Sequence, residues 1–321
     1  MDRLILPVLT VSAAPVITDL AARPGVEIVG VVVDLGHDPG LDALRDMALG
    51  AGAVRCHVVD KRDALAEGVL WPALRAGALA AAGAPVYTAL SLPVVAEAVA
   101  DVARFEEATG AVVWADLAAD RRRLRALLAA LMPGAGLVSA TGTPAAPAAA
   151  NLWATVAVAP VEGPAAHVEG PGLPARHPRS AASAAGRVTV RIGFERGVPV
   201  RLNGVPMTPA ELIDSLATLA EDQGVAPWRV RDHDSGEAWI VRAPAARVLQ
   251  QAMAVMTARS VDGPTADLLE HLAGVYADLV REGLWCSPAR AGIDALVDRV
   301  LASAGGDVTL QIDNGRIEGD A

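Results

Sequence analysis

Apolar and polar positions alternate along residues 1–132 in a way that predicts strands and helices in turn. Residues 4–9 and 26–33 are short apolar runs, which is typical of strands buried on both faces of a parallel sheet. A helix through residue 22 joins them, with Pro15 in its first turn, where a missing N–H costs nothing. The same patterns predict further strands at 55–59 and 111–114, and helices at 41–51, 93–109 and 120–131. The first part of the chain is therefore predicted to be a doubly wound α/β domain.

The middle of the chain loses this pattern. From residue 133 to 186 the composition shifts to Pro, Ala, Gly and Ser, and only residues 151–160 have a strand-like pattern there. Most of this segment is therefore predicted to be linker or loop.

The last part of the chain mixes strand and helix patterns. Residues 188–192 predict a strand, and 193–204 predict a hairpin with a turn at Arg196–Gly197 and an Asn-Gly turn at its end. A capping box is predicted at Thr208 and Glu211. Further helices are predicted at 244–258, 264–282 and 288–304, and a last strand at 307–312. We therefore expect a degenerate nucleotide-binding-like α/β domain over 1–145 and a second, α+β domain over 146–321.

Composition narrows the classes of partner. The chain of 321 residues carries a net charge of −10, which disfavours nucleic acid or an anionic membrane as the main partner. No apolar run is expected to span a bilayer, and the N-terminus lacks the features of a signal peptide, so we expect a cytoplasmic protein. The two cysteines, Cys56 and Cys286, lie far apart and predict neither a disulfide framework nor a metal site.

The loop after the first strand, LTVSAAP at residues 9–15, opens onto the carboxyl edge of the predicted sheet. Folds of this kind bind their ligands at that edge. The loop nevertheless contains no glycine, lysine or carboxylate, the groups on which a nucleotide site would depend.

Several stretches resemble argininosuccinate synthetase. They are LWPALRAGAL (70–79), NLW (151–153), FERGVPVRLNG (194–204), TPAELIDSLATLAEDQGV (208–225), YADLVREGLWCSP (276–288) and GDVTLQIDNGRIEG (306–319). They follow the family's order over almost the whole chain. The resemblance implies an adenine nucleotide alpha-hydrolase-like domain followed by a synthetase-type domain. It also implies ATP-dependent joining of citrulline and aspartate through a citrullyl-adenylate, with release of pyrophosphate, usually by a homotetramer.

The chemical motifs of the family are missing. Its pyrophosphate loop, SGGLDTS, aligns without gaps on residues 9–15. Glycines let a backbone curl around phosphate oxygens, whereas Val11 is β-branched and Pro15 removes one N–H donor. We therefore expect this loop to keep its place in the fold without holding a triphosphate. The lost phosphate loop comprises Leu9, Thr10, Val11, Ser12 and Ala13.

Two further binding segments have changed. The family's HGATGKGNDQ loop falls on residues 114–123, where its threonine becomes Leu117, its lysine becomes Ala119, and its asparagine–aspartate pair becomes Arg121 and Arg122. In the citrulline segment, tyrosine, serine and arginine become Ala84, Ala89 and Leu92. Residues that still resemble the family's are Thr88, Pro93, Arg125 and Asp232.

The remaining polar and aromatic groups supply candidates for ligand binding. They are Tyr87, Thr88, Trp114, Asp116, Arg121, Arg125, Asp232 and His233. Some of them have a structural alternative. Arg121 and Arg125 mark an anion site or the solvated first turns of a helix capped by Asp120; Trp114 lines a pocket or lies in the core. Tyr87 and Thr88 are expected on a loop.

The other reactive side chains can also be interpreted as structural residues without a chemical role. His37 is expected in an exposed loop near the family's adenine site, and His233 lies in a DHD sequence suited to acid–base work or to a solvated loop. Cys286 is interpreted as a buried thiol rather than a nucleophile. No spacing suggests a metal site.

Three functions remain open. The first is a repurposed enzyme, as in specialised metabolism, that uses the old cleft on a less polar substrate with no cofactor and no ATP. The second is a non-catalytic ligand-binding or regulatory paralogue, and the third is an ATP-dependent ligase with relocated residues. The former cleft is expected to persist as a pocket with an apolar floor formed by Leu9, Val11, Ala84, Ala89, Leu92 and Leu117. Because the sequence ends before the family's C-terminal oligomerisation arm, we expect a homodimer.

Overall fold

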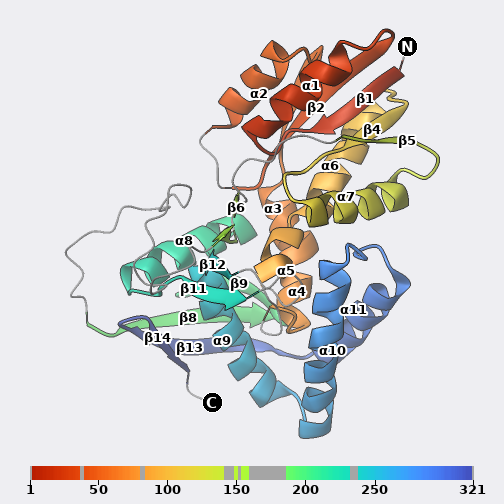
Figure 1. Cartoon of the computed structure of the whole chain (residues 1–321). Helices are drawn as coiled ribbons and strands as arrows, with labels where there is room; N and C mark the ends of the chain where they lie inside the picture. Colours follow the sequence, from red (N-terminus) through yellow and green to blue (C-terminus); the bar gives the residue numbers. More distant parts are fainter. Residues whose placement is uncertain are drawn as a thin grey trace.

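The computed structural model describes residues 2–36, 40–79, 84–140, 148–150, 153–158, 186–231 and 238–319. Its first sheet is parallel, with the strand order β3-β2-β1-β4-β5 (Figure 1). The strands are β1 Asp2–Pro7, β2 Val26–Asp34, β3 Arg55–Asp60, β4 Gly110–Val113 and β5 Gly136–Ser139.

Helices cover both faces of this sheet, as the uninterrupted apolar strands predict. On one face, Leu4 and Leu6 of β1 join a core cluster with α1 (Ala14–Ala21) and α2 (Leu41–Gly50). On the other face, Ile5 joins a larger cluster with α6 (Leu92–Phe105) and α7 (Ala118–Leu131). Successive residues of one strand thus point into different layers, and the predicted doubly wound α/β domain is confirmed.

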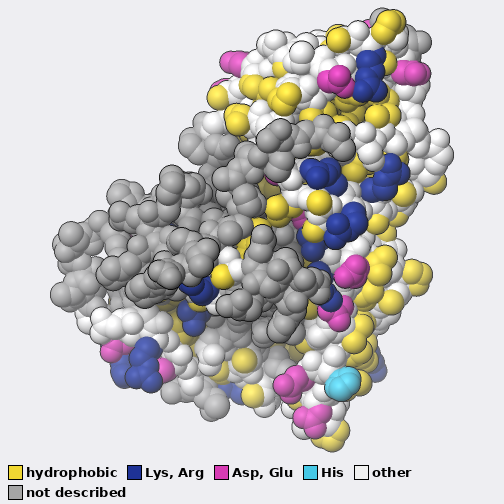
Figure 2. All heavy atoms as spheres, viewed as in Figure 1, with side chains coloured by type: hydrophobic (Ala, Val, Ile, Leu, Met, Phe, Trp, Pro, Cys, Tyr) yellow, Lys and Arg dark blue, Asp and Glu magenta, His cyan; other side chains and the backbone are white. Residues whose placement is uncertain are grey.

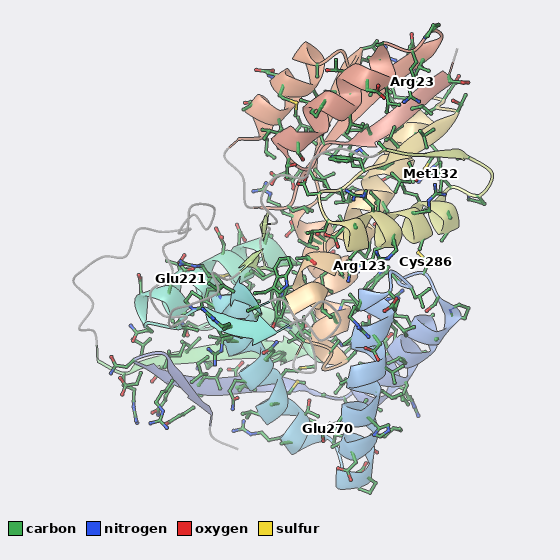
Figure 3. The ribbon with its side chains drawn as sticks, in the orientation of Figure 1. Arg23, Arg123, Met132, Glu221, Glu270 and Cys286 are labelled. Carbon is green, nitrogen blue, oxygen red and sulfur yellow. The ribbon has the colours of Figure 1, made fainter. Side chains whose placement is uncertain are left out.

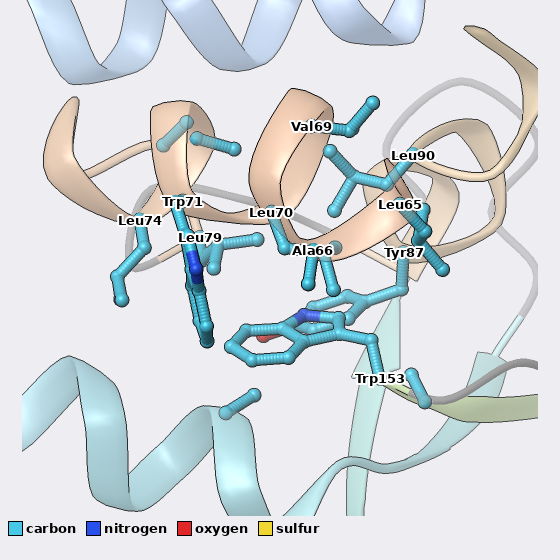
Figure 4. Packing of buried hydrophobic residues seen from close by; sticks show 14 of the residues in the cluster. Leu65, Ala66, Val69, Leu70, Trp71, Leu74, Leu79, Tyr87, Leu90 and Trp153 are labelled. Carbon is cyan, nitrogen blue, oxygen red and sulfur yellow. The ribbon is translucent and has the colours of Figure 1, made fainter. Parts of the chain in front are cut away.

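A helical crossover connects β3 to α6. It consists of α3 (Arg62–Leu65), a π-helical turn η2 (Ala66–Leu70), α4 (Trp71–Arg75) and α5 (Ala84–Ala89). Pro72 lacks the N–H that would bond the carbonyl of the preceding turn, which is a sufficient cause for the π-turn. The crossover buries Trp71 edge-on against Trp153, with ring centroids 6.5 Å apart (Figure 4).

The described residues of the second half form two antiparallel sheets. One has the order β10-β9-β8-β13-β14 and the other β11-β12-β7-β6. The strands of the first are β10 Val205–Pro206, β9 Val198–Leu202, β8 Val188–Glu195, β13 Gly305–Asp313 and β14 Arg316–Gly319. Those of the second are β11 Trp228–Arg231, β12 Ala238–Arg242, β7 Thr155–Val158 and β6 Ala148–Ala150.

Four helices complete the described part of this half, and the sequence near their ends explains where they begin. They are α8 (Pro209–Asp222), α9 (Pro244–Ser260), α10 (Gly263–Arg281) and α11 (Pro288–Val300). Thr208 and Glu211 form the predicted capping box at the start of α8. Arg196 and Asn203, each followed by glycine, have positive φ angles of 53° and 52°, as tight hairpin turns require. An antiparallel sheet with these helices confirms the expected α+β second part.

The two halves share one hydrophobic core. The larger cluster runs from the parallel sheet through the crossover to the strands and helices of the second half. Polar contacts add to it: Asp63 Oδ1 accepts a hydrogen bond from Ala210 N (2.9 Å), and Arg75 Nη1 lies 2.7 Å from Asp298 Oδ1. The domain boundary expected near residue 145 stays a prediction, because residues 141–147 lie outside the described part.

One segment differs from the expectation that no apolar run is long enough to span a bilayer. Val86–Phe105 is long and apolar enough to cross a membrane by length and composition, with a mean hydropathy of 1.5. However, 83% of its most apolar window is buried inside the protein. It is packed largely as a core helix of the fold.

Candidate functional site

The fold brings two loops together at the carboxyl edge of the parallel sheet. β1 pairs with β4 through Leu4 opposite Gly110 and Ile5 opposite Ala111. The loop after β1 continues into a short 3₁₀ turn, η1 (Val11–Ala13), and the loop after β4 leads into α7. This edge is also the point where the strand order reverses, which is where ligands bind in open α/β sheets.

The two loops are bonded to each other through Asp116. Thr10 Oγ1 donates a hydrogen bond to Asp116 Oδ2 (2.8 Å), and Ser12 Oγ donates to Asp116 Oδ1. The hydroxyl oxygens of Thr10 and Ser12 lie 2.5 Å apart. We call these three residues the loop bridge. All three are half-buried, so their mutual hydrogen bonds replace contacts with water.

The bridge places a carboxylate near the start of α1. Ser12 precedes Ala14, the first residue of that helix, by two positions. The N-terminus of a helix attracts anions because its backbone N–H groups are unpaired. Through its hydrogen bond with Ser12, the carboxylate of Asp116 is held two residues before this helix begins.

Arg121 is used to hold the β4–α7 loop. Its Nη1 donates to the carbonyl oxygens of Ala115 (2.7 Å) and Asp116 (3.2 Å). Its Cζ also lies 5.5 Å from the ring centroid of Trp114, a cation–π distance. Trp114 itself is 1% exposed and belongs to the core cluster on the α1 face, so the core interpretation of this residue is confirmed.

Asp120 is not the helix cap that its sequence position suggested. α7 begins at Ala118 with Leu117 as its N-cap, which places Asp120 in the first turn. There it is buried and lies 2.6 Å from Arg123 Nη1. Burial raises the pKa of Asp120 above its ordinary value, and the Arg123 guanidinium opposes that rise. Asp120 is thus a buried ion-pair partner rather than a solvated cap.

Arg123 connects this region to the second half of the chain. Its Nε donates to the carbonyl oxygen of Arg281 at the end of α10. Figure 3 shows Arg123 on α7 facing the turn that carries Cys286. Gly283 makes the close approach possible, because a Cβ there would lie 2.7 Å from Arg123 Cα. Sequence reasoning missed this contact, since its two sides are about 160 residues apart.

Arg125 lies on the β5 side of α7. It is exposed, and its Nη2 donates to Ser139 Oγ at 2.7 Å. Of the two arginines expected at an anion site, Arg121 is therefore bound to backbone carbonyls and Arg125 to a serine. The structure does not bring their guanidinium groups into one described anion site.

Tyr87 and Thr88 are buried in a helix, and the expected loop is wrong at this point. Both belong to α5, and they are 2% and 4% exposed. Tyr87 packs edge-on against Trp228, with ring centroids 5.8 Å apart, and its hydroxyl accepts a hydrogen bond from Gln250 Nε2 (3.3 Å). Burial raises the pKa of Tyr87 to about 12. The aromatic ring thus joins the two halves of the chain.

The residues expected to form the apolar floor of a pocket differ in their exposure to solvent. Ala89 and Leu92 are buried, Leu9 and Leu117 are half-buried against the larger core cluster, and Val11 is 65% exposed. Most of these side chains therefore pack in or against the core, whereas Val11 faces solvent. The persistence of a pocket beside them stays a prediction.

Four further candidates remain, of which the structure describes one. His37, Asp232 and His233 lie outside the described residues. Cys286 is exposed, not buried as expected, and desolvation nevertheless raises the pKa of its thiol, which lowers its reactivity. Within the described ranges, no group of three His, Cys, Asp or Glu side chains is arranged to hold a metal ion.

Two family models match this chain. The model of the arginosuccinate synthase N-terminal HUP domain matches residues 10–115, and that of the arginosuccinate synthase C-terminal domain matches residues 177–319. A parallel α/β domain of the HUP class followed by a synthetase-type domain is also what the fold shows. The chain belongs to the argininosuccinate synthase family.

Curated relatives agree with this assignment over nearly the whole chain. The argininosuccinate synthase of Desulforamulus reducens is 25% identical, over 94% of this chain and 82% of the relative. That of Pelotomaculum thermopropionicum is 26% identical, over 91% of this chain and 80% of the relative. That of Chlorobaculum parvum is 30% identical, over 91% of this chain and 80% of the relative. The resemblance drawn from the short motifs is therefore confirmed.

Proposed function

We propose that this chain has lost the ATP-dependent ligation of its family. We further propose that it binds or transforms, without ATP, a small molecule less polar than citrulline and aspartate. The loop bridge carries the proposal. In the family resemblance, the two loops that Asp116 joins are the ones that meet phosphate, and here they are bonded to each other.

A triphosphate would meet unfavourable charge at this place. Its phosphate oxygens would lie beside the carboxylate of Asp116, and like charges only a few ångströms apart repel strongly where water is scarce. Opening the bridge would also leave the half-buried Asp116 without its hydroxyl donors. Both effects oppose nucleotide binding.

The groups that normally offset phosphate charge are absent from this loop or already used. Val11 and Pro15 replace residues whose backbone flexibility and N–H groups would surround phosphate. Arg121, the nearest guanidinium to Asp116 in sequence, already binds two backbone carbonyls. Any attraction for a nucleotide would therefore depend on first breaking existing contacts.

A second candidate function is a non-catalytic ligand-binding or regulatory paralogue. Polar side chains at the former site are paired with one another, as Asp116 is with Thr10 and Ser12, and Asp120 is with Arg123. Paired groups of this kind stabilise a fold and are poorly placed to move protons in a reaction. A gene neighbourhood of biosynthetic enzymes would favour the repurposed enzyme, whereas arginine genes would favour this candidate. A cytoplasmic location is proposed for either.

The direct test of the lost ligation is pyrophosphate release. The purified chain would be incubated with ATP, magnesium, citrulline and aspartate, with the Chlorobaculum parvum relative as the positive control. We expect release no faster than in buffer alone. Release that depends on both citrulline and aspartate would contradict the proposal and favour a ligase with relocated residues.

The test of a new ligand is a crystal structure of the purified protein, together with mass spectrometry of small molecules that copurify. We expect density for a small molecule beside the loop bridge. A site filled entirely by side chains would favour a structural paralogue without a ligand.

A further inference from the structure

The loop bridge contains more close oxygen contacts than it has protons to share among them. Each hydroxyl carries one proton, and Thr10 and Ser12 both donate theirs to the carboxylate of Asp116. The two hydroxyl oxygens nevertheless lie 2.5 Å apart, a distance at which a proton normally lies between them. The lone pairs that remain on the three side chains can only accept. The group is therefore complementary to a ligand that donates hydrogen bonds.

The carboxylate of Asp116 is also held by neutral groups alone. Its hydrogen-bond donors are the two hydroxyls of the bridge, and Arg121 binds its backbone carbonyl oxygen. No described Lys, Arg or His side chain forms an ion pair with it. By contrast, the buried carboxylate of Glu106 in the same domain is paired with Arg55. A half-buried carboxylate without an ion pair attracts a cation more strongly than a fully hydrated one does.

Apolar residues adjoin the bridge in sequence. Leu9 and Val11 flank Thr10, and Leu117 follows Asp116. Leu9 and Leu117 are half-buried, and Val11 is 65% exposed. Binding sites for small molecules combine apolar surface with a few placed polar groups, and both are present at this edge of the sheet.

We propose that the loop bridge binds the primary ammonium group of an otherwise apolar amine that has no carboxylate of its own. This inference rests on the proposed function, since it names the class of small molecule that the former site takes. An ammonium group has three N–H donors and no acceptor, so it brings donors and a positive charge at one atom. A carboxylate or a phosphate brings neither.

The spacing of the oxygens favours an ammonium group over a divalent metal ion. Neighbouring oxygen ligands of an octahedral magnesium ion lie about 2.9 Å apart, because each is about 2.1 Å from the metal. Thr10 and Ser12 hold their hydroxyl oxygens at 2.5 Å, which is too close for two such ligands. Their site also has a single carboxylate, and no group of three metal-binding side chains is found in the described ranges.

The arginines of α7 do not reverse this choice. Figure 2 shows basic side chains gathered over α7, where Arg122 and Arg125 are exposed. Arg125 donates to Ser139 on the β5 side, and Arg121 donates to backbone carbonyls. Solvent screens exposed charges, whereas Asp116 would touch the ligand directly. The ligand is therefore expected to be a cation.

The test is calorimetric titration of the full chain with butylamine and phenethylamine. Each amine is compared with the alcohol and the carboxylate built on the same carbon skeleton, and phenethylamine is also compared with L-phenylalanine. We expect saturable binding of the amines, at least about tenfold tighter than that of the alcohols, because a charge-assisted hydrogen bond is lost in the alcohol. The carboxylates are expected not to bind, and phenylalanine to bind more weakly than phenethylamine.

A variant with unchanged side-chain size assigns the contact. Asp116→Asn is expected to weaken binding of the amines about tenfold or more and to change binding of the alcohols little. Asp222→Asn, at an exposed position near the end of α8, is the matched control and is expected to bind both as the wild type does. Circular dichroism checks that both variants fold, and the comparison of amine with alcohol on the wild type needs no variant.

Four results would overturn the inference. They are no saturable binding of either amine up to millimolar concentration, alcohols that bind as tightly as the amines, phenylalanine that binds more tightly than phenethylamine, and Asp116→Asn that binds the amines as the wild type does. Each of them leaves the proposed loss of ligation intact. Pyrophosphate release that depends on citrulline and aspartate would instead contradict the proposed function itself.

Discussion

At the scale of single residues, Asp116 links the loop after β1 to the loop after β4. Sequence comparison identified Thr10 and Ser12 as replacements that remove a phosphate loop, and it placed Asp116 among residues that contact a ligand. In the structure these three residues bond to one another. Their separation of more than 100 positions explains why local pattern did not reveal the contact. The adjacency of two parallel strands, each followed by polar residues, is the signal that pointed toward it.

The loop bridge predicts a measurable contribution to stability. Asp116→Ala is expected to lower the free energy of unfolding by about 2 kcal/mol, because it leaves two half-buried hydroxyls without their charged acceptor. Asp222→Ala, at an exposed position near the end of α8, is the control and is expected to change it by less than about 0.5 kcal/mol. Urea denaturation measures both. Equal effects would mean that the bridge adds nothing.

A second residue predicts how stability varies with pH. Glu106, at the end of α6, is buried and accepts hydrogen bonds from Arg55 (2.9 Å to Oε1), with His57 Nε2 also 2.8 Å from Oε1. The Arg55 hydrogen bond is the largest cause that lowers the pKa of Glu106 below its ordinary value of 4.5. A carboxyl whose pKa is lower in the folded state stabilises the fold above its unfolded pKa. This stabilisation is lost as pH falls through the folded pKa.

Glu106→Gln is therefore expected to lower the free energy of unfolding by about 2 kcal/mol near pH 7, and by much less near pH 3. The neighbouring exposed residue supplies the control, since Glu107→Gln is expected to have little effect at either pH. Thermal unfolding at several pH values measures the difference. A difference between wild type and Glu106→Gln that stays constant from neutral to acidic pH would contradict this role.

At the scale of elements, α7 illustrates where local signals lose to tertiary contacts. An aspartate is a strong N-cap, so the sequence predicted that α7 begins at Asp120. The helix begins two residues earlier, at Ala118, and Asp120 is buried in its first turn beside Arg123, which is itself held by the distant carbonyl oxygen of Arg281. By contrast, the capping box of α8 and the Asn-Gly turn were predicted correctly, since all their partners are close in sequence. Local chemistry predicts an element's ends only where no distant partner competes.

The contact between α7 and the α10–α11 turn predicts a specific sensitivity to side-chain volume. Gly283 has a positive φ of 76°, and an added Cβ would lie 2.7 Å from Arg123 Cα. Gly283→Ala is therefore expected to lower the free energy of unfolding by about 2 kcal/mol or more. Gly292→Ala, inside α11 where a Cβ meets nothing within 4 Å, is expected to raise it by about 0.5–1 kcal/mol. If both substitutions stabilise the protein, the close approach of α7 is wrong.

At the scale of the whole molecule, hydrophobic pattern predicted the layers but not how the two halves combine. The alternation of apolar runs was sufficient for the doubly wound sheet, because each strand carries its own signal. The joint between the halves was not visible, since it depends on contacts such as Tyr87 with Trp228, more than 100 residues away. For the same reason Tyr87 was expected on a loop and is in fact buried in a helix. The residue replacements in the two loops were visible in the sequence, whereas the hydrogen bonds that join these loops were not.

The most direct test of the central claim is calorimetric titration of the full chain with ATP and magnesium. Because the loop bridge holds a carboxylate where the family's loops meet phosphate, we expect no saturable heat up to millimolar nucleotide. The Chlorobaculum parvum argininosuccinate synthase, titrated under the same conditions, is the reference. Saturable binding of ATP to this chain with a micromolar dissociation constant would contradict the account.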